Sequence, residues 1–455
     1  MNSYAKESAS LYSKGYEARC QSALDFALDS APAYFDWRKL DIGGDDPFER
    51  LAALPVLDKA LMRRYGPAGF LPQGMALASA LSKGEVEIVN TSGSTGDQVS
   101  NIWSQEWWNA SEQASWQLNA FAANACGKGH KEAILSSPLC VGFPCEDAFL
   151  PKARRTVGSF LFLNERVDPS KWPEPLMRRM VAELDELKPE IIEANPSYLA
   201  RLARFMLQEG LRLSFKPKLI TFTYENPSLF HRRSIEKAFG SPMASSYGST
   251  EAGYVFMQCE AGYFHQNSDF CHVDFIPFSE SAGAPEGAGS LLVSSFGNKW
   301  RSLLRFDIGD IAIASKEPCP CGRSHGLTLK SIEGRAVNLT LRQSGRLVTQ
   351  AELDRRLFTV DGLAEYQLLQ DSPEAARILF AGDPGANTSK IESAMRECLR
   401  ELYGSGMRFE FQAEAGLPPD PPGKYRLSKP LFPIDARSFW DIDYAPPQIE
   451  EEAIA

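Results

Sequence analysis

The sequence predicts an α/β fold: a large N-terminal α/β domain with a small α+β domain at the C-terminal end. Between about residues 85 and 225, short apolar runs alternate with segments of helical periodicity. After about Glu280 the pattern changes to short strands separated by glycines. With 455 residues and 44% hydrophobic content, the chain is also too long for one ordinary core, so more than one domain is expected.

The first part of the chain combines helices with short strands. Apolar residues before about Tyr65 recur at mixed three- and four-residue spacing, which is typical of helices. Glu85–Asn90 is predicted to be a short strand. A helix is predicted over Ser111–Gly127, with Gly127 as its stop, and a buried strand over Lys131–Leu139.

The central part of the chain alternates between helical and strand-like patterns. Residues 173–210 are predicted to form a helix, the strand-like run "EIIEAN" and a second helix, and Pro217–Glu225 contains another short buried strand. Strands that alternate with helices favour a parallel sheet with loops at the strand ends.

The later part is richer in strands. They are predicted within residues 289–297, 303–315 and 327–348. From residue 339 onward, helices (351–358 and 389–404) mix with strands (365–370, 376–382 and 407–414), as in a small separate domain.

Composition excludes several classes of protein. A formal net charge of -10 disfavours a nucleic-acid-binding surface, which needs a basic face. No run of about 18 apolar residues is present, so we expect no membrane-spanning helix. The first 20 residues lack the apolar core of a secretory signal. The nine cysteines are scattered over a large chain, and we expect a reduced, cytoplasmic protein.

The stretch "NTSGSTGDQVS" (Asn90–Ser100) contains six consecutive Ser, Thr or Gly residues: Thr91, Ser92, Gly93, Ser94, Thr95 and Gly96. Glycines allow close approach of a ligand, and hydroxyl and backbone N–H groups suit phosphate oxygens. A flexible Ser/Gly linker would have the same composition. A kinase-type P-loop is disfavoured, because Asp97 follows Gly96 instead of the required Lys.

Four further stretches complete a pattern: "SSYGSTEAG" (245–253), "LLRFDIGD" ending at Asp310, "EGRAVN" (333–338) and "PPGKYRLSKP" (421–430). Together with the Ser/Thr/Gly loop, they occur in the order and approximate spacing of one family. The sequence resembles the adenylate-forming enzymes, and in particular the phenylacetate–CoA ligase branch. The resemblance extends from Asn90 to Lys424.

The resemblance implies ATP-dependent activation of a carboxylic acid. The carboxylate attacks the α-phosphate, pyrophosphate leaves, and CoA then displaces AMP from the acyl-adenylate. The implied domains are residues 1–333 (ATP and acid binding), a hinge at 334–338 and a mobile C-terminal lid at 339–455. The implied small molecules are ATP, Mg²⁺, CoA and the acid.

The resemblance also assigns roles to single residues. The loop from Thr91 to Gly96 would hold the leaving phosphates, Tyr247 and Gly248 would border the adenine, and Thr250 would contact the α-phosphate. Glu251 would bind Mg²⁺, which prefers hard oxygen ligands. Asp310 would bind the ribose hydroxyls and Arg335 the nucleotide. Tyr224 and Glu225 would border the adenine and the acid, although the family usually has a small residue at the place of Tyr224.

Lys424 matches the family's mobile catalytic lysine. Its cation would bridge the α-phosphate and the attacking carboxylate. The hinge departs from the family pattern, because Val337 and Asn338 replace an acidic pair. We therefore expect adenylation to be retained and thioester formation to be slow or replaced by transfer to another acceptor. For Arg305, the alternative to a role at the nucleotide is a purely structural ion pair.

A second set of residues indicates a structural zinc site. "PCPCGRSHG" supplies Cys319 and Cys321, and "QCEAGYFHQ" supplies Cys259 and His265. Some members of the resembled branch have a structural zinc held by such a combination, and soft Cys and His ligands suit a tetrahedral zinc. Cys271, His272 and His325 are alternative ligands, and reduced cysteines in a turn are the alternative to any metal.

The acid pocket is predicted from "SSPLCVGFPCEDAF" (136–149), with Cys140, Phe143 and Cys145 as lining residues. The 11% aromatic content favours an aryl acid, although core packing would use the same residues. Two other functions stay open: transfer of the adenylate to an amine or a carrier-protein thiol, and a non-catalytic relative that binds the acid or the nucleotide. We expect no nucleic-acid or membrane partner, and a homodimer is one assembly to consider.

Overall fold

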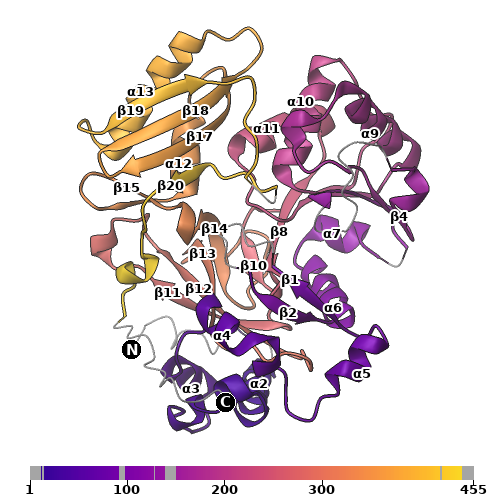
Figure 1. The fold of residues 1–455 in the computed structure, drawn as a ribbon, viewed down its shortest axis with the longest axis vertical. Coiled ribbons are helices and arrows are strands. Elements are labelled where there is room, and N and C mark those ends of the chain that lie inside the picture. The colour runs from indigo at the N-terminus through magenta and orange to yellow at the C-terminus, as the bar shows by residue number, and fades with distance from the viewer. Residues whose placement is uncertain are drawn as a thin grey trace.

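The computed structural model describes residues 12, 15–91, 98–127, 129–138, 150–420 and 423–442. Figure 1 shows a central sheet with helices packed beside it, a group of N-terminal helices at one end, and a separate sheet with α13 at the other. None of the helices in these ranges is both long and apolar enough to cross a membrane.

The N-terminal helices pack against one end of the central sheet. Their bounds are α2 (Tyr16–Ser30), α3 (Pro47–Ala53), α4 (Lys59–Gly69) and α5 (Leu77–Ser82). Asp46 and Asp58 cap α3 and α4, since each carboxylate accepts hydrogen bonds from backbone N–H groups of the first turn. The predicted helical character of this region is confirmed.

The central sheet has twelve strands within the described residues. In spatial order they are β11 (Cys271–Pro277), β12 (Ala288–Ser295), β13 (Phe306–Ala314), β14 (Thr328–Arg335), β10 (Phe264–Gln266), β9 (Gly253–Gln258), β8 (Met243–Ser249), β7 (Leu219–Phe222), β6 (Ile191–Ala194), β3 (Glu132–Leu135), β5 (Phe160–Phe162) and β4 (Thr156–Val157).

The sheet is parallel only in part. From β8 through β7, β6 and β3 to β5 the pairings are parallel, as the alternation of strands and helices predicted. From β8 to β11 each pairing is antiparallel. The parallel half is joined by helical crossovers, whereas the other half is built of hairpins. The antiparallel pairing begins with β9, earlier along the chain than the change of pattern predicted after about Glu280.

Among the described residues, five helices flank the sheet: α6 (Gln105–Trp116), α7 (Ala120–Ala125), α9 (Glu174–Leu187), α10 (Pro196–Gln208) and α11 (Leu229–Phe239). The single helix predicted over Ser111–Gly127 is wrong. The chain breaks at Asn119, whose side-chain oxygen caps α7 through Ala122 N and whose amide donates to the carbonyl of Gln258 on β9. This long-range contact overrides the local helical pattern.

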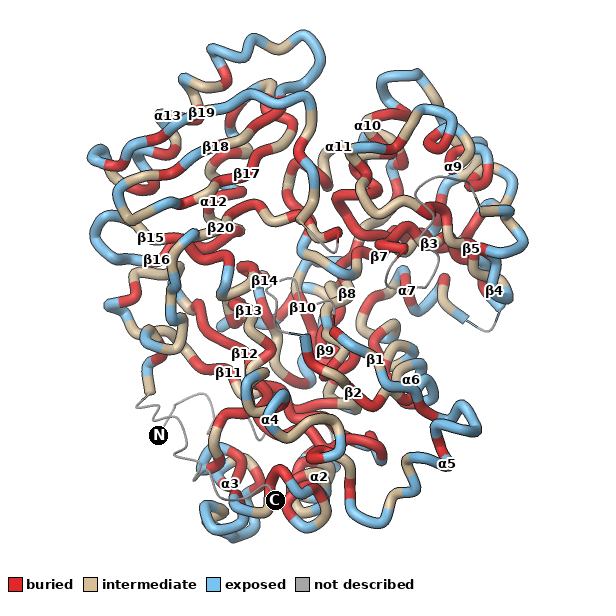
Figure 2. Tube along the Cα trace, viewed as in Figure 1, coloured by how far each residue is buried: buried red, intermediate tan, exposed pale blue. Residues whose placement is uncertain are grey.

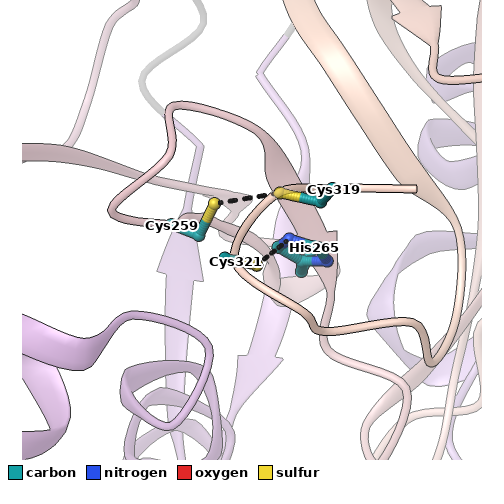
Figure 3. Close-up of side chains that lie close together, drawn as sticks. All are labelled: Cys259, His265, Cys319 and Cys321. Atoms are coloured by element: carbon teal, nitrogen blue, oxygen red, sulfur yellow. Dashed lines mark hydrogen bonds between the residues drawn. The ribbon is translucent and has the colours of Figure 1, made fainter. Parts of the chain in front are cut away.

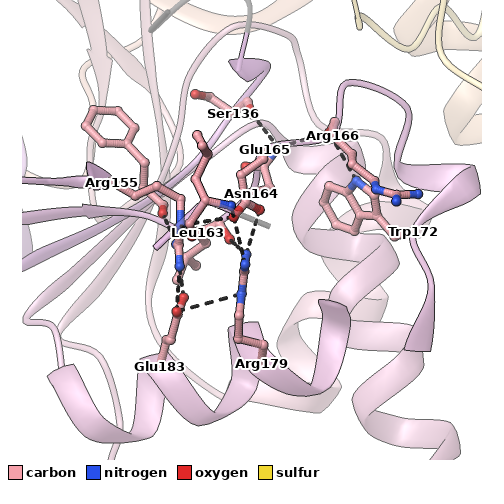
Figure 4. A network of polar contacts seen from close by, with 11 residues as sticks. Ser136, Arg155, Leu163, Asn164, Glu165, Arg166, Trp172, Arg179 and Glu183 are labelled. Atoms are coloured by element: carbon pink, nitrogen blue, oxygen red, sulfur yellow. Dashed lines mark hydrogen bonds and ion pairs between the residues drawn. The ribbon is translucent and has the colours of Figure 1, made fainter. Parts of the chain in front are cut away.

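An ionic network ties α9 to the edge of the sheet (Figure 4). Arg155 is 1% exposed and binds both oxygens of Glu183 on α9, at 2.6 and 3.1 Å. Its Nε lies 3.1 Å from the fully buried Glu165, which Arg179 also contacts. Because every charge in this group is paired, burying it is tolerated, and loss of one partner would leave an uncompensated buried charge.

A four-stranded sheet forms a second unit with its own core. Its order is β19 (Arg408–Ala413), β18 (Ala375–Gly382), β17 (Leu363–Ser372) and β20 (Ser428–Pro430), and its helices are α12 (Gln350–Leu357) and α13 (Thr388–Tyr403). The small hairpin of β15 (Thr340–Leu341) and β16 (Leu347–Val348) precedes it. In Figure 2 much of the trace along the strands of both sheets is red, and these buried residues belong to clusters on the large sheet and to a separate cluster in the small unit.

The described end of the chain returns to the large sheet. Trp440 is buried against Val56, Ile276 and Leu292, and its indole N–H donates to Ser290. We call residues 436–442 the C-terminal strap. The predicted assignment of all residues after 338 to a lid did not anticipate this packing.

Candidate active site

The Ser/Thr/Gly loop joins two short paired strands, β1 (Glu87–Asn90) and β2 (Ser100–Trp103). Thr91 closes its base: Thr91 N donates to the carbonyl of Val99 at 2.9 Å, and Thr91 Oγ1 accepts from Val99 N at 3.0 Å. Thr91 is therefore held at the end of a hairpin. Ser92, Gly93, Ser94, Thr95 and Gly96 lie outside the described residues.

The "YGSTE" motif is the hairpin between β8 and β9. Gly248 is required there, because a Cβ would lie 2.0 Å from the carbonyl oxygen of Gly253 on the partner strand. Tyr247 Oη donates to Asp310 Oδ2 at 3.0 Å. Arg335, opposite Asp310 in the β13–β14 pairing, has its Nε 3.6 Å from Asp310 Oδ1. Three predicted nucleotide-binding residues thus meet, although they lie on separate strands.

The carboxylate of Asp310 has the largest electrostatic effect on Arg335. It raises the pKa of Arg335 above the ordinary value, with Tyr247 and Glu251 adding to the effect against the opposing effect of burial. Because Glu251 is close enough to act on Arg335, the metal-binding candidate and the nucleotide-binding candidates belong to one region.

Glu251 is 2% exposed and sits just after β8. Burial would raise its pKa, but Lys59 and the buried Arg301, together with hydrogen bonds, hold that pKa below its ordinary value. Lys59 Nζ on α4 lies 3.3 Å from Glu251 Oε1, and Arg301 Nη2 donates to the carbonyl of Thr250 at 3.5 Å. An ionised carboxylate of this kind is a suitable hard-oxygen ligand for Mg²⁺ shared with substrate phosphates.

Tyr224 and Glu225 follow β7. Tyr224 adopts a φ of 71°, which is rare for a bulky residue, and its hydroxyl donates to Glu193 at 3.1 Å. Both oxygens of Glu225 are engaged, one by Ser197 N at 3.1 Å and the other by Tyr425 N at 2.6 Å. Burial raises the pKa of Glu225 to about 7.

A group of carboxylates lies next to Tyr224. Burial raises the pKa of Glu193 to about 8, and the nearby Glu132 and Glu112 add to the shift. Burial likewise raises the pKa of Glu112 to about 7, although it accepts a hydrogen bond from Tyr254 at 2.8 Å. The three side chains come from α6, β3 and β6, so only the fold brings them together.

The loop carrying Lys424 docks on the large domain. Asn195 Nδ2 donates to the carbonyl of Gly423 at 3.3 Å, and Tyr425 N donates to Glu225. Gly423 has a φ of 111°, and a Cβ there would lie 2.4 Å from the Tyr198 hydroxyl, so only glycine fits. The Lys424 ammonium acts on Glu225, lowering its pKa against the larger effect of burial. The lysine therefore lies beside residues of the other domain.

The predicted hinge is well packed in this arrangement. Asn338 is 5% exposed, and its side-chain oxygen accepts from Arg426 Nε at 2.7 Å. Ser428 donates to the carbonyl of Asn338 at 2.6 Å. Arg305, in contrast, is a structural residue, since its guanidinium donates to the carbonyls of Leu51 and Leu54.

Cys259, His265, Cys319 and Cys321 form one cluster (Figure 3), with all ligand atoms within 4.8 Å of one another. The Cys259 and Cys319 sulfurs are 3.6 Å apart, and Cys321 Sγ lies 3.2 Å from His265 Nε2. Ligands of a tetrahedral zinc are separated by about 3.5–3.8 Å, so this donor set fits the metal. Across the described ranges, the cluster includes neither Cys271, His272 nor His325.

The predicted acid-pocket residues Cys140, Phe143 and Cys145 lie outside the described residues. Four residues near the site were not predicted: Lys59, Asn195, Tyr198 and Arg301. Nothing local in the sequence marks Lys59, because its partner Glu251 is far along the chain, in the turn between β8 and β9. Asn195 and Tyr198 do follow a buried strand directly, a position where site residues of α/β sheets occur, and that signal could have found them.

No family model matches the chain. Two curated proteins are similar in sequence. Protein CapK of Staphylococcus aureus is 23% identical over 253 residues, which is 55% of each chain. Phenylacetate-coenzyme A ligase of Thermus thermophilus is 26% identical over 160 residues, 33% of this chain and 35% of that protein. The matches thus span about half or less of these curated relatives.

Solved structures match over most of the chain. 2-Hydroxyisobutyryl-CoA ligase in its postadenylation state, with the acyl-AMP bound, has a TM-score of 0.68 at 17% identity, covering 95% of this chain and 91% of that one. The same enzyme in its thioesterification state, with CoA also bound, has a TM-score of 0.54 over the same coverage. The chain has the fold of the adenylate-forming enzymes, as the resemblance implied.

Proposed function

We propose that the protein activates a carboxylic acid with ATP and transfers the acyl group to CoA. In the first step the acid's carboxylate oxygen attacks the α-phosphorus, and the bond to pyrophosphate breaks. In the second step the thiolate of CoA attacks the acyl carbon, and AMP leaves with the electrons of the broken C–O bond. We further propose that the acid is aromatic.

The observation that carries the proposal is the docking of the Lys424 loop. Through Gly423 and Tyr425, this loop binds Asn195 and Glu225 of the other domain, next to the nucleotide-binding candidates. A cation delivered to a preformed site can offset the charge of a carboxylate that approaches a phosphate. Gly423 lets the loop lie against Tyr198 of the large domain, where a side chain would clash. A lysine on a purely structural surface loop would not need this close contact.

The other residues have complementary roles in this proposal. Thr91 and the loop that follows it hold the leaving phosphates, with Lys59 beside them. Tyr247 and Gly248 border the adenine, Asp310 accepts hydrogen bonds from the ribose, Thr250 donates to the α-phosphate, and Arg335 neutralises the nucleotide. Mg²⁺ held by Glu251 would screen phosphate charge during the reaction.

Zinc is proposed as a purely structural group. Cys259 and His265 come from the β9–β10 hairpin, and Cys319 and Cys321 come from the loop between β13 and β14. The metal would join two segments that are also linked by the short β10–β14 pairing and by the ion pair of Arg323 with Glu260. Thr328 Oγ1, 3.4 Å from His265 Nδ1, would orient the imidazole.

The test is acid-dependent exchange of labelled pyrophosphate into ATP across a panel of aromatic and aliphatic acids. We expect exchange with at least one aromatic acid, and formation of a thioester and AMP when CoA is added. Exchange without thioester would favour the alternative of an amine or carrier-protein thiol as acceptor, which the uncharged hinge at Val337 and Asn338 supports. Folded protein that binds ATP but exchanges with no acid would contradict adenylation.

A further inference from the structure

A cavity of about 250 Å³ lies between the two domains, and two of its lining residues, Ser197 and Tyr425, donate backbone hydrogen bonds to Glu225. Ser197, Arg201, Arg204 and His231 line it from α10 and α11 of the large domain, and Glu365 and Tyr425 line it from the small domain. Its wall combines arginine, histidine and serine side chains with apolar residues such as Pro169, Leu417 and Pro419.

Arg201 is the first unusual feature of this cavity. Among the residues that the structure describes, it has no hydrogen-bond or ion-pair partner, and its Nε is buried. Burial lowers the pKa of Arg201 below its ordinary value. A half-buried charge without a partner is unfavourable, and proteins ordinarily compensate such charges.

His231 is the second unusual feature of this cavity. Its side chain is 3% exposed, and within the described part of the chain its Nδ1 is buried without a hydrogen-bond partner. Its ring meets that of Tyr425 edge to face, with centroids 5.2 Å apart. Burial and, to a smaller extent, Arg204 lower the pKa of His231 to about 3, so the neutral ring retains one N–H donor.

The charges around the cavity do not cancel. Arg204 forms an ion pair with Glu365 across the domain boundary. His231 is neutral, so the positive charge of Arg201 is left without a compensating negative charge. An arginine offers a planar fork of donors that matches the oxygens of a carboxylate or phosphate. A small oxyanion would therefore supply what the cavity lacks.

We propose that this cavity binds a small oxyanion, a carboxylate or phosphate group, through Arg201 with support from Arg204 and His231. Since the lining residues come from both domains, the ligand contacts both only in the present arrangement. A ligand shifts a conformational equilibrium by its differential affinity for the two states, so the bound anion favours this arrangement. The site does not depend on the proposed enzymatic function.

The test is calorimetric titration of the full chain with inorganic phosphate and, separately, with citrate, at constant ionic strength in chloride. We expect saturable binding of at least one probe at one per chain. Arg201→Gln should weaken that binding at least tenfold. The control Arg212→Gln removes an exposed arginine outside the cavity and should bind like the parent. Phosphate binding would point to phosphorylated ligands, and citrate binding alone to carboxylates.

Thermal stability provides a second readout. Because Arg201 has no partner, Arg201→Gln should unfold at the same or a higher temperature than the parent in anion-free buffer, and the probe should raise only the parent's Tm. Hydrogen exchange should slow on both α10 and β17 when the probe binds. Absence of binding by both probes, or equal binding by Arg201→Gln, would overturn the site. Protection confined to α10 would overturn the link between domains.

Discussion

At the residue scale, Glu251 and Lys424 are the two candidates of opposite charge, Glu251 beside Lys59 and Lys424 beside Glu225. Glu251 remains ionised despite burial because Lys59 and Arg301 lie near it. Lys424 is placed by a loop whose neighbours on both sides bind the large domain. The two residues are therefore positioned before any substrate arrives, which is the condition for effective electrostatic stabilisation.

We expect Glu251→Gln and Lys424→Ala each to lower acid-dependent pyrophosphate exchange by about 10²-fold or more, since each removes one preorganised charge. Lys390→Ala, which removes an exposed lysine of α13, is the matched control and should exchange at the parent rate. A near-normal rate in either site variant would remove that residue from the active site.

Glu193 predicts a pH dependence of stability. Its pKa is raised from 4.5 to about 8 in the folded protein, so the stability due to its protonated form is present below the unfolded pKa and is lost as the pH rises through about 8. Gln stays neutral and still accepts hydrogen bonds from Thr223 and Tyr224. The Tm of Glu193→Gln relative to the parent should thus increase between pH 5 and pH 8.5.

The matched control for this pH profile is Glu236→Gln on the exposed face of α11, whose Tm relative to the parent should not change with pH. A Glu193→Gln difference that is constant between pH 5 and pH 8.5, or that decreases, would show that Glu193 is ionised in the folded protein over this range.

At the element scale, the Cys/His cluster connects two hairpins. The described strands β10 and β14 pair there over few residues, and an ion pair of Arg323 with Glu260 adds a second link. A metal bound at the cluster would hold the loop between β13 and β14 in place, and so stabilise the strands that carry Asp310 and Arg335.

We expect about one zinc per chain in protein washed with a weak chelator, measured by elemental analysis. Cys319→Ala/Cys321→Ala should contain no zinc and should unfold at a lower temperature, whereas Cys398→Ala on α13 should keep the metal. Metal-free parent protein together with an unchanged Tm of the double variant would exclude the site.

At the scale of the whole molecule, several contacts restrain the small domain, and two of them involve the hinge and the C-terminal strap. The hinge is packed through Asn338 against Arg426, and the C-terminal strap holds the large sheet through Trp440 and through Arg437, which pairs with Asp58 and Asp307. A rotation between two arrangements requires packings of similar free energy. Both connections favour the arrangement in which the Lys424 loop is docked.

We therefore expect adenylation to be faster than thioester formation in single-turnover measurements that start from preformed acyl-adenylate and CoA. Arg437→Ala loosens the strap and should speed thioester formation without changing adenylation. Arg408→Ala, an exposed arginine of β19, is the control. Equal rates of the two steps in the parent would show that neither the uncharged hinge nor the strap limits transfer.

Much of the fold is encoded in neighbouring residues. The helices α9 and α10 and the strand between them follow from periodicity alone, because each period repeats within one segment. The motif from Tyr247 to Glu251 could also be recognised from the sequence, because its residues follow one another in a single hairpin. The pair Cys319 and Cys321 pointed to a group of Cys and His side chains, and the fold brings these four side chains together.

Tertiary structure alone decided the remaining features. The pairing of Lys59 with Glu251, the group of Glu112, Glu132 and Glu193, and the cavity around Arg201 join residues from different elements. The break at Asn119 and the return of the strap to the large sheet likewise depend on a distant strand. Local sequence patterns determine which residues share a face of an element, whereas these contacts depend on how complete elements pack, which no single segment encodes.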